Sequence, residues 1–164
     1  MNTSKNHNLY RLIERAFPAD SSLPLVLSPD SQTYSYAWVE ERSARLANYL
    51  VDLGARPGDR VTVQVEKSPL VLCLYLACLR AGLVYHPLNT AYQASELAYF
   101  LGDAKPRVVV CAGQDMPLFE SLLSQHGAWA LCSLEADGSG SLVEEAAACG
   151  STFDTITPGS SGLR

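Results

Sequence analysis

The sequence predicts an α/β fold: a mostly parallel sheet with helices on both faces. Strand-like segments alternate along the chain with helix-like segments, and connections of a few residues join them, as in a right-handed parallel sheet. Residues 108–110 are Val-Val-Val, and such continuous apolar character is typical of a strand that is buried on both faces. The parallel strands are expected near residues 60–65, 84–88, 107–111 and 128–132.

Length and composition fit one soluble domain with its own core. The chain has 164 residues, of which 48% are hydrophobic and 18% charged, and the mean hydropathy is +0.04. The net charge of −5 and the dispersed Lys and Arg argue against nucleic acid as a partner, since nucleic acid requires clustered positive charge. The apolar run 70–79 is shorter than the ~20 residues of a membrane span. The N-terminus lacks the pattern of a secretory signal, so a cytoplasmic location is expected.

The five cysteines are interpreted as small buried side chains in a reducing compartment. Their number is odd, and most lie within apolar runs. None of their spacings has the paired pattern of a zinc site, so no metal site is expected. The cysteines are Cys73, Cys78, Cys111, Cys132 and Cys149.

The chain is expected to begin with a short amphipathic helix near residues 9–16 that lies on the domain. A short apolar strand at 25–28, a turn with the sequence PDSQ and a return strand at 33–35 then suggest a hairpin. The apolar residues that suggest the helix are Leu12, Ile13, Ala16 and Phe17.

The clearest helix pattern follows Ser35, whose hydroxyl can cap the first turn. Gly54 supplies a left-handed stop at the far end. The apolar residues that recur at helical spacing between them are Val39, Leu46, Leu50 and Leu53.

Next along the chain, every second residue of RVTVQV (60–65) is valine, which predicts a strand with one buried face. Ser68 is expected to cap the next helix, and Pro69 is expected in its first turn. The following helix ends at Gly82 and is apolar nearly all round, so it should pack on more than one side.

The remaining elements continue the alternation and end in a polar tail. A helix over 94–104 presents Leu97, Phe100, Leu101 and Ala104 on one face. The later elements are a helix over 117–125, the strand at 128–132, a helix over 142–148 and a tail without core signal over 151–164. Residues 1–150 are therefore taken as the folded unit.

No complete active site can be assembled from the chain. The phosphate-loop patterns GxGxxG and GxxxxGK[ST] and the nucleophile elbow GxSxG are absent. PGSSG at 158–162 is interpreted as a flexible linker. His86 lies beside the expected ligand edge, but a structural histidine is the more common case there. An exposed pair is the favoured interpretation of Glu66 and Lys67.

Four segments give the chain a resemblance to the N-terminal part of an adenylate-forming acyl-CoA synthetase. They are TYS (33–35), LGARPGDRV (53–61), LACLRAGLVYHPLN (76–89) and ELAYFLGDAKPRVVV (96–110). Within that family, EKS (66–68) together with PLNTAY (87–92) is most similar to malonyl-CoA synthetases. The resemblance covers residues 9–150, about the opening third of a typical member.

The resemblance implies a two-step reaction that depends on ATP, Mg²⁺ and CoA. The carboxylate of the acid attacks the α-phosphate of ATP to give an acyl-adenylate and pyrophosphate, and the thiol of CoA then displaces AMP. The family's phosphate loop, acidic motif and catalytic lysine are expected beyond Arg164. No catalytic residue is therefore expected within this chain, which should be inactive alone and bind none of these molecules tightly.

The resemblance also suggests weak candidates for CoA contact in the turn after the strand at 84–88. Some relatives have a basic residue two positions after the asparagine of this turn, whereas this chain has Ala91. Any contact would then come from Asn89, Thr90, Tyr92 or backbone groups.

Two other functions and one property of the isolated chain remain open at this point. The first alternative is a non-catalytic α/β interaction or regulatory domain. The second is a small flavodoxin-like nucleotide binder, which the missing phosphate loop disfavours. Because an incomplete sheet exposes an edge, self-association of the chain is also expected.

Overall fold

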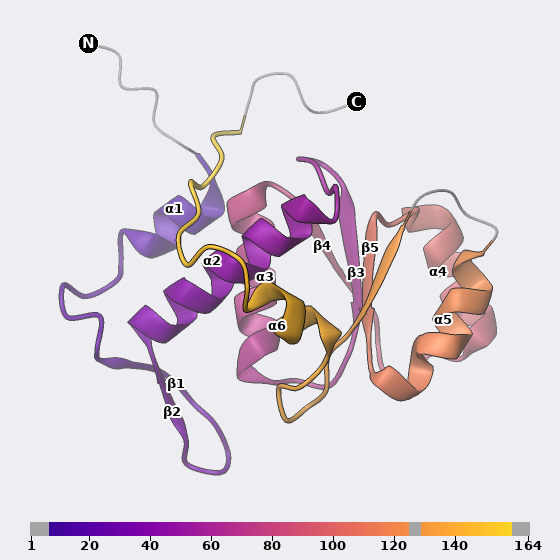
Figure 1. The fold of residues 1–164 in the computed structure, drawn as a ribbon, viewed down its shortest axis with the longest axis horizontal. Coiled ribbons are helices and arrows are strands. Elements are labelled where there is room, and N and C mark those ends of the chain that lie inside the picture. The colour runs from indigo at the N-terminus through magenta and orange to yellow at the C-terminus, as the bar shows by residue number, and fades with distance from the viewer. Residues whose placement is uncertain (1–6, 125–128, 159–164) are drawn as a thin grey trace.

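The structure is a computed structural model and describes residues 7–124 and 129–158. A four-stranded parallel sheet lies between helices, and a two-stranded antiparallel hairpin stands to one side (Figure 1). The strand order is β4-β3-β5-β6. The predicted fold class is confirmed. The sheet consists of β3 (Arg60–Gln64), β4 (Val84–Pro87), β5 (Val108–Cys111) and β6 (Ala130–Ser133).

Helices cover both faces of this sheet (Figure 1). On one face lie α2 (Tyr36–Asp52), α3 (Pro69–Ala81) and α6 (Ser141–Ala146), and on the other lie α4 (Ala94–Ala104) and α5 (Met116–Leu123). The other elements are α1 (Leu9–Glu14), β1 (Pro24–Leu27), β2 (Thr33–Ser35) and the short 3₁₀ helix η1 (Gly113–Asp115).

Strand β3 differs from its prediction, because both of its faces are buried. The alternation in RVTVQV predicts one buried face, but Thr62 and Gln64 are as inaccessible as the valines beside them. β3 lies between β4 and β5, with α3 on one side of the sheet and α4 on the other. The polar side chains are tolerated there because each has a hydrogen-bond partner, His86 for Thr62 and the Asn89 carbonyl for Gln64.

The predicted ends of α2 and α3 are confirmed. The Ser35 hydroxyl accepts a hydrogen bond from the Trp38 amide, and the Ser68 hydroxyl accepts one from the Val71 amide. Gly54 and Gly82 both have left-handed backbone angles, with φ of 85° and 68°.

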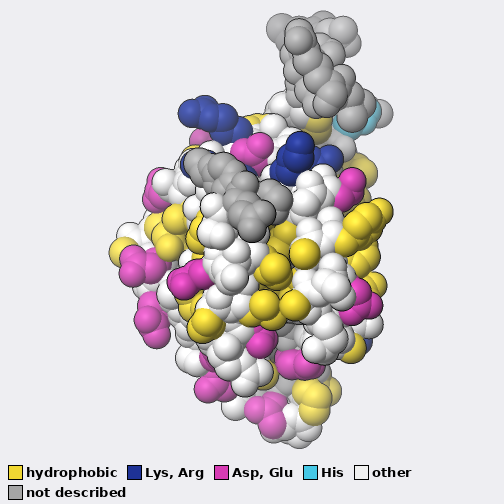
Figure 2. All heavy atoms as spheres, turned by 90° about the vertical axis from the view of Figure 1, so that its right-hand side faces the viewer, with side chains coloured by type: hydrophobic (Ala, Val, Ile, Leu, Met, Phe, Trp, Pro, Cys, Tyr) yellow, Lys and Arg dark blue, Asp and Glu magenta, His cyan; other side chains and the backbone are white. Residues whose placement is uncertain are grey.

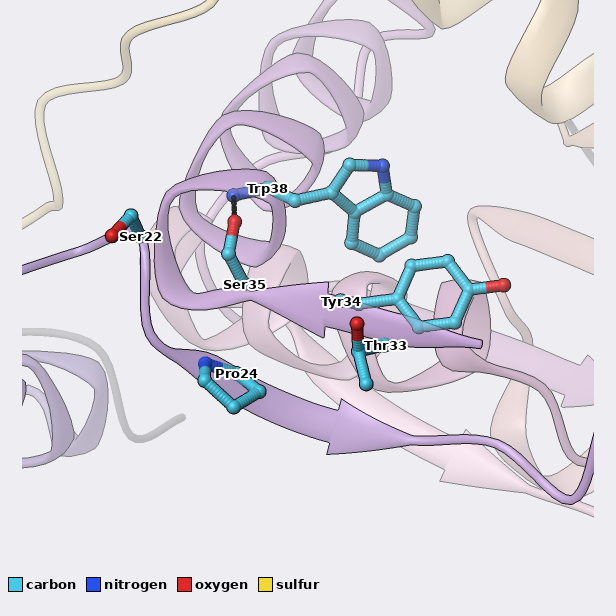
Figure 3. A pocket seen from close by; sticks show the side chains of 6 residues that line it. All are labelled: Ser22, Pro24, Thr33, Tyr34, Ser35 and Trp38. Atoms are coloured by element: carbon cyan, nitrogen blue, oxygen red, sulfur yellow. Dashed lines mark hydrogen bonds between the residues drawn. The ribbon is translucent and has the colours of Figure 1, made fainter. Parts of the chain in front are cut away.

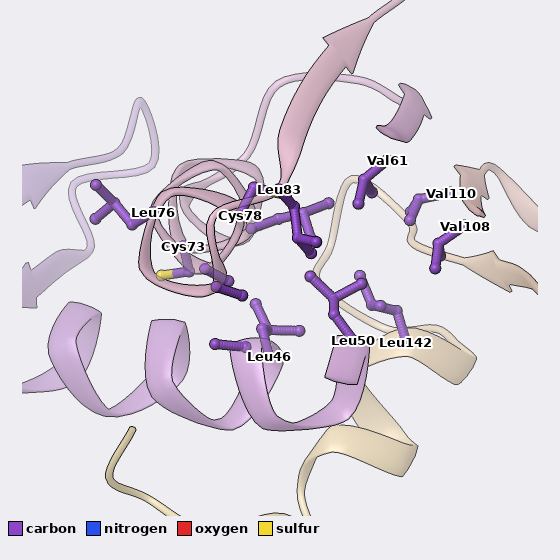
Figure 4. Close-up of a cluster of buried hydrophobic side chains, with 14 of the residues drawn as sticks. Leu46, Leu50, Val61, Cys73, Leu76, Cys78, Leu83, Val108, Val110 and Leu142 are labelled. Carbon is purple, nitrogen blue, oxygen red and sulfur yellow. The ribbon is translucent and has the colours of Figure 1, made fainter. Parts of the chain in front are cut away.

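The main hydrophobic core lies between the sheet and the α2–α3 layer (Figure 4). Leucines of α2 and α6 meet the buried face of α3 and the valines of β3 and β5. α3 packs on several sides, as its all-round apolar sequence predicts. A second, smaller core lies under α4 and α5 and includes Leu97, Leu101 and Phe119.

Several sequence expectations are corrected at the ends of the domain. α1 stops at Glu14, and its buried residue is Tyr10, whereas Leu12 is 52% exposed. Cys149 is partly exposed, although the other four cysteines are buried as predicted. The expected helices over 117–125 and 142–148 run over 116–123 and 141–146.

The first residues of the expected polar tail also pack on the domain. Phe153 lies against the main core, and Thr155 is buried. Residues 159–162 of the expected linker and His126 lie outside the described residues. The division of the chain at residue 150 stays a prediction.

Candidate functional site

The turn between β4 and α4 holds the predicted site residues at the carboxyl end of the sheet. Pro87 ends the strand, and the Leu88 amide still donates to the Val63 carbonyl at 2.8 Å. Asn89 shapes the turn, because its side-chain oxygen accepts from the Ala91 amide at 2.9 Å. The side chains of Asn89 and Thr90 are exposed.

Tyr92 belongs to an aromatic group behind this turn rather than pointing freely into solvent. Its ring stacks on Phe100 with the ring centres 5.1 Å apart, and Tyr99 meets the edge of Phe100 at 5.4 Å. The three aromatic residues, Ser95 and Glu96 line a shallow hollow of about 330 Å³. The structure therefore brings Tyr92 near a possible ligand surface, but Asn89 and Thr90 do not line that hollow.

The face formed by α4 and α5 carries exposed apolar side chains (Figure 2). Hydrophobic side chains gather in its middle and acidic side chains are scattered around them. Tyr99 is 70% exposed and Leu118 also faces solvent. An aromatic surface of this kind can stack a planar ligand group, but none of the described residues that line the hollow carries a positive charge for a phosphate.

His86 is held as a structural histidine. Its Nδ1 lies 2.9 Å from the Thr62 hydroxyl in the neighbouring strand. Burial, followed by the positive charge of Arg60, lowers its pKa from the ordinary value. A neutral ring paired with a threonine lacks the carboxylate that would orient a general base, so the geometry favours the structural interpretation.

A first hollow outside this turn lies where the hairpin meets the start of α2 (Figure 3). It has a volume of about 250 Å³ and is lined by neutral side chains, among them Tyr34 and Trp38, whose rings lie 4.5 Å apart. The Ser35 hydroxyl is already used as the helix cap. None of the described residues that line this hollow is an acid or a base that could activate its serine and threonine hydroxyls.

A second hollow of about 260 Å³ lies between the β3–α3 and β6–α6 connections. Arg42, Ser68 and Gly138 contribute to its lining, and the Arg42 guanidinium lies over the Trp38 ring at 5.8 Å. This hollow is at the carboxyl edge of the sheet, where open α/β sheets bind ligands.

The crevice between β3 and β5 is the point at which the chain changes direction across the sheet, the usual ligand position in such folds. On the other side of β5, Glu135, just after β6, accepts a hydrogen bond from the Gly113 amide, just after β5, at 2.7 Å. A Cβ at Gly113 would lie 2.7 Å from the same carboxylate oxygen. The Glu135 side chain therefore links the β5 and β6 connections at the carboxyl edge of the sheet.

The cysteines do not provide a nucleophile. Burial raises the pKa of Cys73, Cys78 and Cys111 to about 12, so these thiols stay protonated near neutral pH. In the described part of the chain, no group of three or more His, Cys, Asp or Glu could hold a metal ion. Across the same residues, no helix is long and apolar enough to cross a membrane.

Sequence reasoning missed two polar residues with defined roles, Arg80 and Glu135. Arg80 is buried within the apolar helix α3, where it contacts several neutral groups. A single charge in the run LVLCLYLACLRA was the available signal, because a buried charge requires partners. Glu135 had no comparable signal, since its partner Gly113 is distant in sequence.

Comparison with known proteins connects this fold to one enzyme family. A model of the family described as AMP-binding enzyme matches residues 15–151. Among solved structures, ATP-bound MatB from Rhodopseudomonas palustris superposes with a TM-score of 0.88 at 41% identity, and the match covers 96% of this chain and 31% of that chain.

Two relatives found by sequence similarity are biosynthetic proteins. A linear gramicidin synthase of Brevibacillus parabrevis is 40% identical over 93 residues, which are 57% of this chain and 2% of that protein. Novobiocin biosynthesis protein H of Streptomyces niveus is 33% identical over 106 residues, or 65% of this chain and 18% of that protein. The chain thus spans less than a third of each of these three proteins.

Proposed function

Because the chain belongs to the AMP-binding enzyme family, we propose that it is the N-terminal part of an AMP-forming acyl-CoA synthetase that activates malonate or a similar short carboxylic acid. Its fold is that of the N-terminal region of adenylate-forming enzymes. The observation that carries the proposal is the 41% identity with ATP-bound MatB, which extends over 96% of this chain. The motifs EKS and PLNTAY support the same subclass.

The described residues do not fit ATP and Mg²⁺ by themselves. They include no cluster of carboxylates for the metal, and the sequence has no complete loop for the phosphates. We therefore assign no step of the adenylation to a residue of this chain. The 164-residue chain alone should show no ATP–pyrophosphate exchange, since it has no complete phosphate loop to hold the charge that develops on phosphate.

A second candidate function is acid activation within a peptide synthetase, which the likeness to the linear gramicidin synthase favours. The full-length gene product distinguishes the two candidates through ATP–pyrophosphate exchange with malonate or with amino acids. Malonate-dependent exchange followed by formation of a CoA thioester supports the synthetase. Exchange that depends on an amino acid, without a CoA product, supports the second candidate, and absence of exchange with any acid contradicts both.

Within the proposed synthetase, Asn89, Thr90 and Tyr92 are the candidates for contact with CoA. The turn is exposed, and the aromatic hollow behind it could hold a planar group. Replacing Asn89 and Tyr92 with alanine in the full-length enzyme should raise the KM for CoA and leave the KM for ATP unchanged. Leu27→Ala, on the exposed hairpin away from this turn, is the control. An unchanged KM for CoA in the double variant would contradict the contact.

A further inference from the structure

The segment after α6 is held by side chains instead of by regular secondary structure. Residues 150–157 form neither helix nor strand, yet the segment follows a defined path across α2 toward α1 (Figure 1). The carbonyls of such a segment have no partners in a helix or a sheet, so side chains or water must supply the donors. Four side chains, which we call the carbonyl clamp, supply them: Asn8, Arg45, Asn48 and Arg80.

The first half of the clamp comes from α2. Arg45 Nη1 donates to the carbonyls of Ala147 and Cys149, at 2.9 and 2.5 Å. One turn further along the helix, Asn48 Nδ2 donates to the carbonyls of Gly150 and Thr152, at 2.9 and 2.8 Å. A single face of α2 therefore fixes the start of the segment.

Arg80 of α3 holds the next part of the segment. Its Nη2 donates to the Phe153 carbonyl at 3.2 Å, while its Nη1 donates to the Tyr10 hydroxyl at 3.1 Å and the Ser43 hydroxyl at 2.9 Å. The guanidinium also lies over the Tyr10 ring at 4.5 Å. Arg80 is only 4% exposed, and its hydrogen-bond partners among the described residues are all neutral, including the Glu40 carbonyl. Its position is strongly specified, because a buried charge that lost these partners would be costly.

The end of the segment is seated against the C-terminus of α3. The Ile156 amide donates to the Arg80 carbonyl at 3.0 Å, and the Ile156 carbonyl accepts from Asn8 Nδ2 at 3.3 Å. A Cβ at Gly82 would lie 2.0 Å from Ile156 Cδ1, so Ile156 occupies the space that this glycine leaves open. Three helices thus determine the position of the backbone up to Ile156.

Arg80 also lines a hollow of about 550 Å³, which suggests an alternative role for this arginine, the binding of an anion. The hollow carries more acidic than basic side chains, so an anion would meet net negative charge. Its ionisable lining residues are Arg11, Arg45, Arg80, Glu14, Glu40, Glu41 and Asp154. The contacts of Arg80 therefore favour the anchoring of the segment.

We propose that the carbonyl clamp is a positioning device for the adenylation reaction: it fixes the segment through Ile156 so that the chain beyond it meets the phosphates of ATP in one orientation. This inference rests on the proposed function, in which a Ser/Thr/Gly-rich phosphate loop continues the chain. A loop of that composition has little conformational preference of its own. A rigid anchor ahead of that loop reduces the ordering that the bound state requires, and displacement of such an anchor by about 1 Å can lower a rate about 100-fold.

The test uses Asn48→Asp and Arg80→Gln in the full-length gene product. Asn48→Asp keeps the size of the side chain but places a carboxylate against two carbonyls, and Asn48 lies near the surface, so the fold should persist. The controls are Gln114→Glu, an amide-to-carboxylate change on the opposite face, and Arg15→Gln, both at exposed positions. Hydrogen exchange of the Ile156 amide, which donates to the Arg80 carbonyl, reports on the clamp without any ligand.

In Asn48→Asp, the Ile156 amide should exchange at least about tenfold faster, as expected when the segment loses two neutral hydrogen bonds, while the α3 and β5 amides keep their protection. The kcat of ATP–pyrophosphate exchange should fall about 10- to 100-fold, with the KM for the carboxylic acid unchanged. Arg80→Gln should act in the same direction, and both controls should match the wild type.

Two results would overturn the positioning role: unchanged exchange of the segment in Asn48→Asp, or faster exchange with wild-type kinetics. Failure of the proposed function looks different, because the wild-type protein would then show no ATP–pyrophosphate exchange with any acid. In that case the proposed positioning role is also wrong. Hydrogen exchange still measures whether the clamp keeps the segment in place.

Discussion

At the scale of single residues, burial determines which thiols can react. Cys78 and Cys73 are buried in α3, and the pKa of each is raised to about 12. Cys149 is partly exposed, although burial and the nearby Asp52 also raise its pKa. We expect a disulfide reagent such as Ellman's to modify one thiol of the folded chain, slowly, and all five after unfolding. In Cys149→Ser no thiol should react before unfolding, and fast labelling of that variant would contradict the assignment.

His86 should contribute a pH-dependent part of the stability. Because its pKa is lowered by burial and by Arg60, the folded state binds the proton less readily than the unfolded chain. The contribution is present above the ordinary pKa of about 6.5 and is lost as the pH falls through the lowered value of the folded state. Urea unfolding between pH 7 and 5 should show the decline, and His86→Gln should flatten it. An identical decline in both proteins would show that other groups cause it.

At the scale of elements, alanine substitutions at two glycines with positive φ measure the cost of backbone strain separately from the cost of a packing collision. Gly58 has a φ of 92° and open space around its Cα, whereas a Cβ at Gly82 would collide with Ile156. Alanine in a left-handed conformation costs about 1–2 kcal/mol. Gly58→Ala should therefore lower the free energy of unfolding by about that amount, and Gly82→Ala by roughly 1–3 kcal/mol more, because Ile156 must move. Urea unfolding measures both, and equal losses would contradict the packing of Ile156 at Gly82.

At the scale of the whole molecule, β4 and β6 are the outer strands of the sheet, and within residues 7–124 and 129–158 no further strand pairs with their outer edges. Val84 of β4 is 47% exposed, and an exposed edge strand can pair with a second chain. We expect the isolated chain to self-associate at high micromolar concentration, as seen by sedimentation velocity. Changing Val84 to lysine should reduce the association, because edge lysines oppose strand pairing. A monomeric profile of the wild-type chain at that concentration would contradict the prediction.

Most of the fold follows from local patterns, and the exceptions have identifiable causes. The caps at Ser35 and Ser68 and the stop at Gly82 depend on neighbouring residues alone, so their prediction is confirmed. The second buried face of β3 could not be predicted, because the alternation in RVTVQV is the same whether or not a helix covers the polar side. Leu12 was expected on the apolar side of the first helix, but the buried Tyr10 meets Arg80 instead.

The candidate site was predictable in part. The turn at Pro87 and Asn89 was located from its residue types, whereas the stacking of Tyr92 on Phe100 depends on how α4 returns against the turn. The contact between Gly113 and Glu135 joins residues that follow different strands, and no local pattern reports it.

The sequence by itself determined the fold class, the order of the elements, the helix caps and the resemblance to a family of adenylate-forming enzymes. These properties depend on the spacing of apolar residues and on local hydrogen bonds, both of which can be followed along the chain. Only the tertiary structure decided that β3 is buried on both faces, that Arg80 joins α1, α2 and α3, and that residues 147–156 are held by the carbonyl clamp. The physical reason is that these contacts join residues as many as 148 positions apart, and such pairs form only when the packed core has placed the helices.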